Sequence, residues 1–178
     1  MRKVKLKNEK ELTIRKAILY DAEKLVQYKK VIGSESDFLT FGENEIKITI
    51  EKEQQNIQAI NSRKNSLLAV ALLDEEIVGL IVLRSGDKVR IKHIGEMGVT
   101  VKKAYHGLGI GSFLLQFLIN WAKETGIIKK INLRVRTDNE NAIKMYEKFN
   151  FKNEGVISRD FYINGKFYDS LFMGLLID

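Results

Sequence analysis

A glycine-rich turn is the segment of this sequence whose residue types best suit the binding of an anion. It reads His106-Gly107-Leu108-Gly109-Ile110-Gly111-Ser112 and lies between an apolar run and a long amphipathic stretch. Glycines let a backbone approach a ligand closely, and the N–H groups at the start of a helix attract negative charge. The turn therefore suits a pyrophosphate, although a tight strand-to-helix connection would use the same residues.

Two common nucleotide-binding motifs do not match this turn. No Lys followed by Ser or Thr closes it, as in the phosphate loop of many ATPases. Its glycines also lack the spacing of the dinucleotide-binding fingerprint. The turn thus argues against an ATPase and against a dehydrogenase.

The composition excludes further classes of site. The chain has 178 residues, 44% of them hydrophobic and 30% charged, which suits one domain with a single core. It has no cysteine, so disulfides, thiolate metal sites and a cysteine nucleophile are excluded. His93 and His106 are too isolated in the sequence to indicate a metal site. No apolar stretch reaches the roughly 18 residues needed to cross a bilayer.

Charge and the amino terminus bear on partners and location. The net charge of +7 favours anionic partners, among them nucleic acid, phosphate-bearing cofactors and acidic protein surfaces. The basic residues are scattered instead of forming a basic helix with interleaved aromatic residues, so nucleic-acid binding is not expected. Residues 1–7 are basic but lead into polar residues instead of an apolar signal core. We therefore expect a cytoplasmic protein without a membrane partner.

The first part of the chain predicts a strand followed by helices. Residues 12–17 resemble a short strand, and Asp21 is placed to cap the helix that follows. Residues 33–45 are rich in Gly, Ser and acidic side chains, which predicts a loop or broken helix able to cover a substrate. Residues 49–61 carry isoleucines at helical spacing in a polar background, so we expect an amphipathic helix there.

The rest of the chain predicts an antiparallel meander and further helices. The meander comprises apolar runs at 66–73, 77–83 and 89–101. The stretch after Gly111 has a strong helical repeat that stops at Gly126. Beyond it lie a strand at 131–135, a short helix whose apolar stripe is Ala142, Met145, Tyr146 and Phe149, and two final strands joined at Asn164-Gly165.

Four segments of this chain resemble the GNAT family of N-acetyltransferases in order and spacing. They are Val99-Thr100-Val101, residues 105–111, residues 133–136 and residues 139–151. The family's turn has Gln or Arg, two residues, Gly, one residue, and then Gly or Ala. Here those positions hold His106, Gly109 and Gly111, and His106 departs from the pattern.

The resemblance implies a fold of the α/β (mixed α+β) class. It predicts one N-acetyltransferase domain over residues 1–178, with a core at about 12–177 and residues 1–11 as an extension or first strand. The central sheet would be mostly antiparallel, with about six to seven strands flanked by about four helices. The resemblance is good from about residue 66 to 151 and looser over residues 12–61.

The resemblance also implies that acetyl-coenzyme A is the cosubstrate. Val99, Thr100 and Val101 would pair their backbone groups with the pantetheine arm as an added strand does, and Asn139 would hydrogen-bond it. The amides from His106 to Ser112 would hold the pyrophosphate, more so than the His106 side chain. Four lysines could face the phosphates or form a solvated basic surface: Lys102, Lys103, Lys144 and Lys148.

Acetyl transfer to an amine needs a route for the amine's proton and an acid for the departing thiolate. Tyr146 matches the family's tyrosine and would be that acid, unless it is only a core aromatic. A tyrosine pKa near ~10 lies close to the ~8.5 of a cysteine-like thiol. Glu96 would take the amine's proton directly or through water, although a solubilising strand-edge role is open. His93, on the same predicted strand, is a weaker candidate base.

Several alternatives stay open from the sequence. The enzyme would acetylate a primary amine of a small molecule or of a peptide or protein, by direct attack in a ternary complex and without a metal. A non-catalytic module that binds acyl-coenzyme A or nucleic acid on the same fold is the rival. The +7 charge disfavours polycationic acceptors unless acidic residues cluster locally. A homodimer is compatible with the sequence, which carries no signal for oligomeric state.

Overall fold

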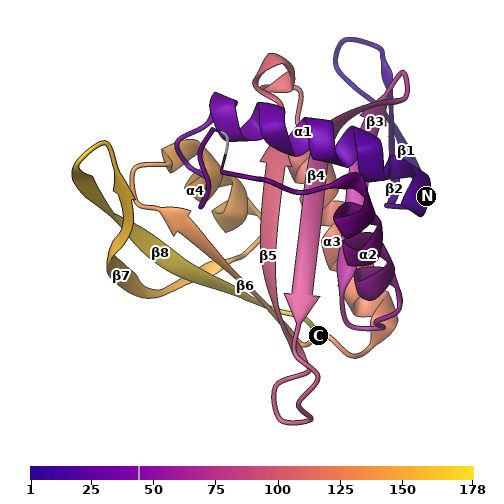
Figure 1. The fold of residues 1–178 in the computed structure, drawn as a ribbon. Coiled ribbons are helices and arrows are strands. Elements are labelled where there is room, and N and C mark those ends of the chain that lie inside the picture. The colour runs from indigo at the N-terminus through magenta and orange to yellow at the C-terminus, as the bar shows by residue number, and fades with distance from the viewer. Residues whose placement is uncertain (44) are drawn as a thin grey trace.

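The structure is a computed structural model that describes residues 1–43 and 45–178. One sheet in the order β1-β2-β3-β4-β5-β6-β8-β7 forms its centre (Figure 1). All neighbours pair antiparallel except β5 and β6, which are parallel. The strands are β1 (Arg2–Lys5), β2 (Glu11–Lys16), β3 (Leu67–Leu73), β4 (Glu76–Ser85), β5 (Ile94–Val101), β6 (Lys130–Arg136), β7 (Lys152–Ile163) and β8 (Lys166–Leu176).

Helices cover both faces of this sheet. They are α1 (Ala22–Glu35), α2 (Ile50–Asn61), α3 (Ile110–Thr125) and α4 (Glu140–Lys148), with short 3-10 turns at Leu19–Asp21 and Lys103–Tyr105. Strand β3 is buried on both sides because its alternate residues belong to two separate cores. Ala69 and Ala71 join the core under α3, whereas Leu68 and Val70 join the core under α1 and α2.

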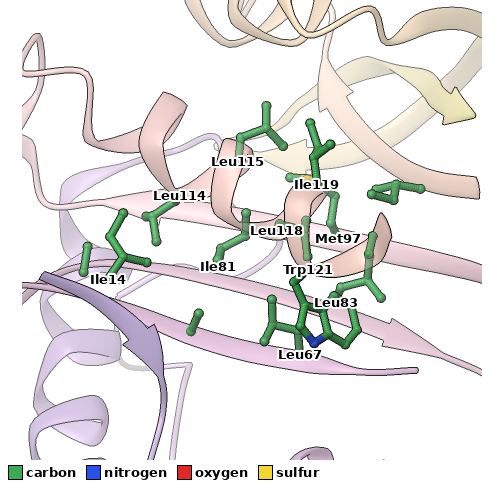
Figure 2. Close-up of a cluster of buried hydrophobic side chains, with 14 of the residues drawn as sticks. Ile14, Leu67, Ile81, Leu83, Met97, Leu114, Leu115, Leu118, Ile119 and Trp121 are labelled. Atoms are coloured by element: carbon green, nitrogen blue, oxygen red, sulfur yellow. The ribbon is translucent and has the colours of Figure 1, made fainter. Parts of the chain in front are cut away.

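The larger core forms where α3 packs on the middle of the sheet. Figure 2 shows Leu114, Leu118 and Trp121 of α3 packed against strand residues that include Ile81 and Leu83. Gly79 allows this close approach, since a Cβ atom there would lie 2.9 Å from the Leu114 side chain. Helix α3 is therefore fixed along its whole length, and its first turn is held at one end of the sheet.

Most of the predicted elements are confirmed. The meander is β3-β4-β5, the strong helical repeat is α3, and Gly126 ends it in the left-handed conformation with φ of 65°. Asn164 and Gly165 both have positive φ and join β7 to β8 as a two-residue turn. No helix in the described ranges combines the length and apolarity needed to cross a bilayer.

Three details differ from expectation. The sheet has eight strands instead of six to seven, because residues 2–5 pair with β2 as a first strand. The third strand of the meander begins at Ile94, since residues 88–92 close into a turn. Asp21 precedes α1, but its carboxylate accepts hydrogen bonds from Ile18 N–H and from the Arg15 guanidinium instead of capping the helix.

Candidate active site

The ladder between β5 and β6 stops well before either strand ends. Its last pair is Glu96 with Asn132, although β5 continues to Val101 and β6 to Arg136. On its other edge β5 stays paired with β4 from Gly95 to Val101. The two strands diverge toward their carboxyl ends (Figure 1), and a cleft of about 1430 Å³ is lined by residues of both. The divergence leaves one edge of β5 available to pair with an extended ligand.

The glycine-rich turn lies at the wall of this cleft. Gly107 and Gly109 have φ of 79° and 80°, a backbone conformation that side chains with a Cβ atom rarely adopt. Within the described residues, the N–H groups of residues 107–112 have no acceptor, and the first bond of the α3 ladder runs from Phe113 N–H to the Gly109 carbonyl. Helix starts with free N–H groups bind phosphates. All of these residues except Leu108, which packs against the core, line the cleft.

His106 lies in the cleft wall, but its imidazole has a partner within the protein. Its Nε2 atom is 2.8 Å from the carbonyl oxygen of Val101. This contact ties the end of β5 to the start of the glycine turn, across the intervening turn Lys103–Tyr105. The side chain thus has a local structural role, which agrees with assigning anion binding to the backbone amides.

The predicted pantetheine residues fall on the diverging part of β5. The side chains of Val99 and Val101 pack against the core under α3. Lys102 N–H donates to a carbonyl of β4, and because the bonds of an antiparallel ladder alternate, the backbone groups of Val99 and Val101 face the other edge, toward the cleft. The Thr100 hydroxyl points to the opposite face and lies 2.9 Å from the Tyr28 hydroxyl of α1. Burial raises the pKa of Tyr28 well above its usual range, so this phenol stays protonated.

Asn139 faces β5 from the far side of the cleft. Its side-chain oxygen accepts the N–H of Ala142 at 3.3 Å and so caps α4. The amide NH₂ group of that side chain has no partner among the described residues, while the residue itself lines the cleft. The neighbouring Asn141 lines the cleft too, and sequence reasoning did not single it out.

Tyr146 is brought to the cleft by α4. Its side chain is only 7% exposed and its ring lies 5.7 Å from that of Phe151. Within the described part of the chain its hydroxyl has no hydrogen-bond partner, and burial raises its pKa to about 12. The near match to a thiol pKa expected from the sequence is therefore wrong. The hydroxyl is a weak acid that stays protonated and remains a hydrogen-bond donor.

Glu96 lies at the point where β5 and β6 separate. Its side chain is 58% exposed, and its carboxylate is 3.4 Å from Arg134 Nε on β6. Arg134 also donates to Asp160 of β7 at 3.3 Å, so one arginine is shared by two carboxylates. His93 is not on β5 but in the preceding turn, outside the cleft lining, and its place as a rival base on that strand is wrong.

The four lysines suggested for phosphate binding do not act alike. Lys102 is paired with Glu76 at 2.6 Å, and Lys144 is paired with Glu140 at 3.1 Å. Lys103 lines the cleft close to the glycine turn, whereas Lys148, in the last turn of α4, is not among the lining residues. The Glu76 carboxyl also accepts the Tyr105 hydroxyl, and both partners hold its pKa below the usual range. Lys102 is thereby committed to the protein and not to a ligand.

Sequence reasoning expected residues 33–45 to cover a substrate, and Phe38 of that segment does line the cleft. It missed the side chains on the sheet face under α1, where Tyr28, Arg84 and Arg134 line the cleft. Alternation along β6 places Arg134 opposite to buried Leu133 and Val135, which the sequence could have indicated. The ion pair of Arg134 with Glu96 could not be predicted from the sequence, because that pair depends on the register between β5 and β6.

Comparison with known proteins agrees with this geometry. The model of the Acetyltransferase (GNAT) family matches residues 35–151. Over 104 residues the chain is 29% identical to an L-amino acid N-acetyltransferase, AaaT, from Escherichia coli, and the match covers 58% of this chain and 64% of that protein. The matched part thus spans less than two thirds of that relative.

Two solved structures share the fold. An acetyltransferase of the GNAT family from Streptococcus pneumoniae superposes with a TM-score of 0.92 and 34% identity, covering 94% of this chain and 99% of that one. A putative acetyltransferase, yncA, from Salmonella typhimurium, solved with its cofactor acetyl-CoA, has a TM-score of 0.82 and 18% identity, with 94% of each chain covered.

The match of the family model to well over half of the chain, together with the diverging strands and the glycine turn between β5 and α3, means that this protein belongs to the GNAT family of acetyltransferases.

Proposed function

We propose that this protein transfers the acetyl group of acetyl-coenzyme A to a primary amine by direct attack. One observation supports this above all. The edge of β5 beyond Glu96, the N–H groups at the start of α3 that have no acceptor among the described residues, and Tyr146 all line a single cleft. These are the groups that a pantetheine arm, a pyrophosphate and a departing thiolate require.

Each proposed residue has one task in the transfer. Acetyl-coenzyme A supplies a thioester whose carbonyl carbon a neutral amine can attack. Glu96 accepts the proton that the attacking nitrogen loses, directly or through water. The Tyr146 hydroxyl donates a hydrogen bond to the sulfur as the carbon–sulfur bond breaks. Since the pKa of that hydroxyl is about 12, it stabilises the thiolate mainly as a donor, and the thiolate takes up a proton from solvent as the product leaves.

The acceptor enters, we infer, on the face of the sheet that carries Glu96 and Arg134. A second cavity of about 490 Å³ adjoins the cleft there, and both are lined by residues of the 36–41 segment and by Phe161. Carboxylates in its lining are those of Asp37, Glu43, Glu45 and Asp160, of which Asp160 is paired with Arg134. The repulsion expected from the +7 net charge is thus offset locally, and cationic amines remain suitable acceptors together with amino acids and peptide amino termini.

The proposed function predicts thiol release from acetyl-coenzyme A that depends on an added amine. We expect turnover with at least one of three sets, namely amino acids, diamines and short peptides with free amino termini. Matched N-acetylated compounds serve as controls and should give none. Binding of acetyl-coenzyme A without turnover on any set would instead favour the non-catalytic module.

The glycine turn predicts a specific loss of cofactor binding in Gly109→Val. A β-branched residue with φ near 80° is strained and would displace the N–H groups that meet the pyrophosphate. Gly126→Val is the matched control, because Gly126 has φ of 65° at the other end of α3 and open space around it. Calorimetry should show acetyl-coenzyme A binding lost only in Gly109→Val. Equal affinity in both variants would exclude the turn as the anion site.

If Glu96 accepts the amine's proton, Glu96→Gln should lower turnover by roughly 10²-fold, with the largest loss at low pH where free amine is scarce. Glu154→Gln is a suitable control, since Glu154 is also ion-paired with a basic residue of β6, Lys130, but lies outside the cleft lining. The rate should be followed across pH for both variants. A profile for Glu96→Gln that overlays the wild-type profile would assign the proton to solvent.

For Tyr146, we expect Tyr146→Phe to retain folding and acetyl-coenzyme A affinity while losing roughly 10² to 10⁴ in turnover. The phenyl ring keeps the contact with Phe151, and no hydrogen bond within the described residues is lost. Because an acid must be protonated to donate, the wild-type advantage should persist as pH rises and decline only near the pKa of about 12. Unchanged turnover would make Tyr146 a core aromatic alone.

A further inference from the structure

Arg136 is a buried arginine at the end of β6. Each nitrogen of its guanidinium donates a hydrogen bond, and two aromatic rings lie against the group. It is 5% exposed, yet it is not among the residues that line the cleft. Its Nε and Nη2 atoms donate to the two carboxylate oxygens of Asp138, at 2.9 and 2.5 Å. Its Nη1 atom donates to the Asp37 backbone carbonyl at 2.9 Å. The carbon at the centre of the guanidinium lies 3.7 Å from the ring centroid of Tyr168 and 4.8 Å from that of Phe38.

These partners come from three elements around the cleft. Asp37 and Phe38 belong to the segment after α1, and Phe38 itself lines the cleft. Asp138 directly precedes Asn139, which caps the helix that carries Tyr146. Tyr168 lies on β8, next to Asp169, whose carboxylate holds the irregular part of β7 through the Arg159 N–H. Arg136 therefore joins the acceptor side of the cleft to the base of α4.

The segment after α1 is anchored at its far end by other means. Leu39 and Phe41 pack against the core under α1 and α2. Gly42 lies so close to α1 that a Cβ atom on Gly33 would come within 2.9 Å of its carbonyl oxygen. Residues 37 and 38 lack such packing, since Asp37 is exposed enough to line the side cavity and Phe38 is 42% exposed. Arg136 attaches both residues to β6, through its hydrogen bond to the Asp37 carbonyl and its contact with the Phe38 ring.

We propose that Arg136 is a positioning residue for the acceptor amine, which holds residues 37 and 38 as one wall of the acceptor side of the cleft. The inference rests on the proposed acetyl transfer. Arg136 itself lies outside the cleft and affects the affinity for the acceptor by holding residues 37 and 38 in place. Arginine suits this place because a planar guanidinium can stack between two rings and pair bidentately at once, which the ammonium of lysine cannot do.

The charges of this cluster are stable near neutral pH. Arg136 holds the pKa of Asp138 below its usual range, chiefly through the hydrogen bonds between them, and Asp138 raises that of Arg136. A depressed carboxyl pKa contributes stability above the unfolded value of roughly 3.9 and loses it only as pH falls through the folded pKa. Assays at pH 7 to 8, roughly three or more units above that value, therefore test the contact geometry and not its titration.

Arg136→Lys should raise the KM for the acceptor roughly tenfold or more, while kcat and the affinity for acetyl-coenzyme A change little. Hydrogen exchange of the amides in residues 36–41 should become faster, whereas that of α4 should not. Tyr168→Leu removes one stacking ring and leaves the bonds to Asp138 and Asp37 available, so it should give a smaller effect of the same kind. Arg159→Lys is the matched control, because Arg159 stacks on Phe167 at 5.1 Å, makes no contact with residues 36–41 that the described part of the chain records, and should leave both readouts unchanged.

The outcomes separate the two proposals. Unchanged hydrogen exchange in residues 36–41 would overturn the role of Arg136, whether or not the protein acetylates amines. An equal loss of affinity for acetyl-coenzyme A and acceptor would also overturn it, because that result indicates a general structural role.

If wild type transfers acetyl to no amine but exchange accelerates as expected, the proposed function fails and the attachment of the loop stands. If Arg136→Lys does not fold, the KM of Tyr168→Leu decides, and an unchanged value contradicts the inference.

Discussion

The early end of pairing between β5 and β6 is the constraint on which the site depends. Two parallel neighbours that separate after Glu96 and Asn132 expose a strand edge inside the domain instead of at its rim. The cleft forms in that gap. The two faces of β5 differ: Val99 and Val101 anchor the strand in the core under α3, while Thr100 contacts Tyr28 of α1 on the other face and Glu96 contacts Arg134 of β6.

The elements beyond the gap are arranged to keep it open. Strand β8 lies between β6 and β7 and pairs with β6 from Lys130 to Arg136. The outer edge of β6 is therefore paired along its full length, whereas its ladder with β5 ends at Asn132. Helix α3 is fixed by the large core, which places its first turn against the end of β5. Arg136 and the Arg134 pairs connect the two sides of the opening through polar groups.

Much of this arrangement follows from local sequence patterns. Helical periodicity located α3 and Asn-Gly located the final turn, whereas the anion site that the glycine spacing indicates at the start of α3 stays a prediction. What local patterns could not supply is the register between distant segments. Glu96 meets Arg134, and Arg136 meets Asp37, across separations that no periodicity encodes. The pKa of Tyr146 was likewise misjudged because burial, not residue type, determines it.

The exposed edge of β5 also has a thermodynamic consequence for the folded protein as a whole. An open strand edge is a template for wrong pairing, and proteins usually cover it or twist it away. Here a ligand that adds itself along residues 97–101 would act as the covering strand. Any such ligand that binds the folded chain and not the unfolded one stabilises it by mass action, by about 2.7 kcal/mol at a free concentration 100 times Kd. The resistance of this protein to heat and aggregation would then follow the supply of its ligand.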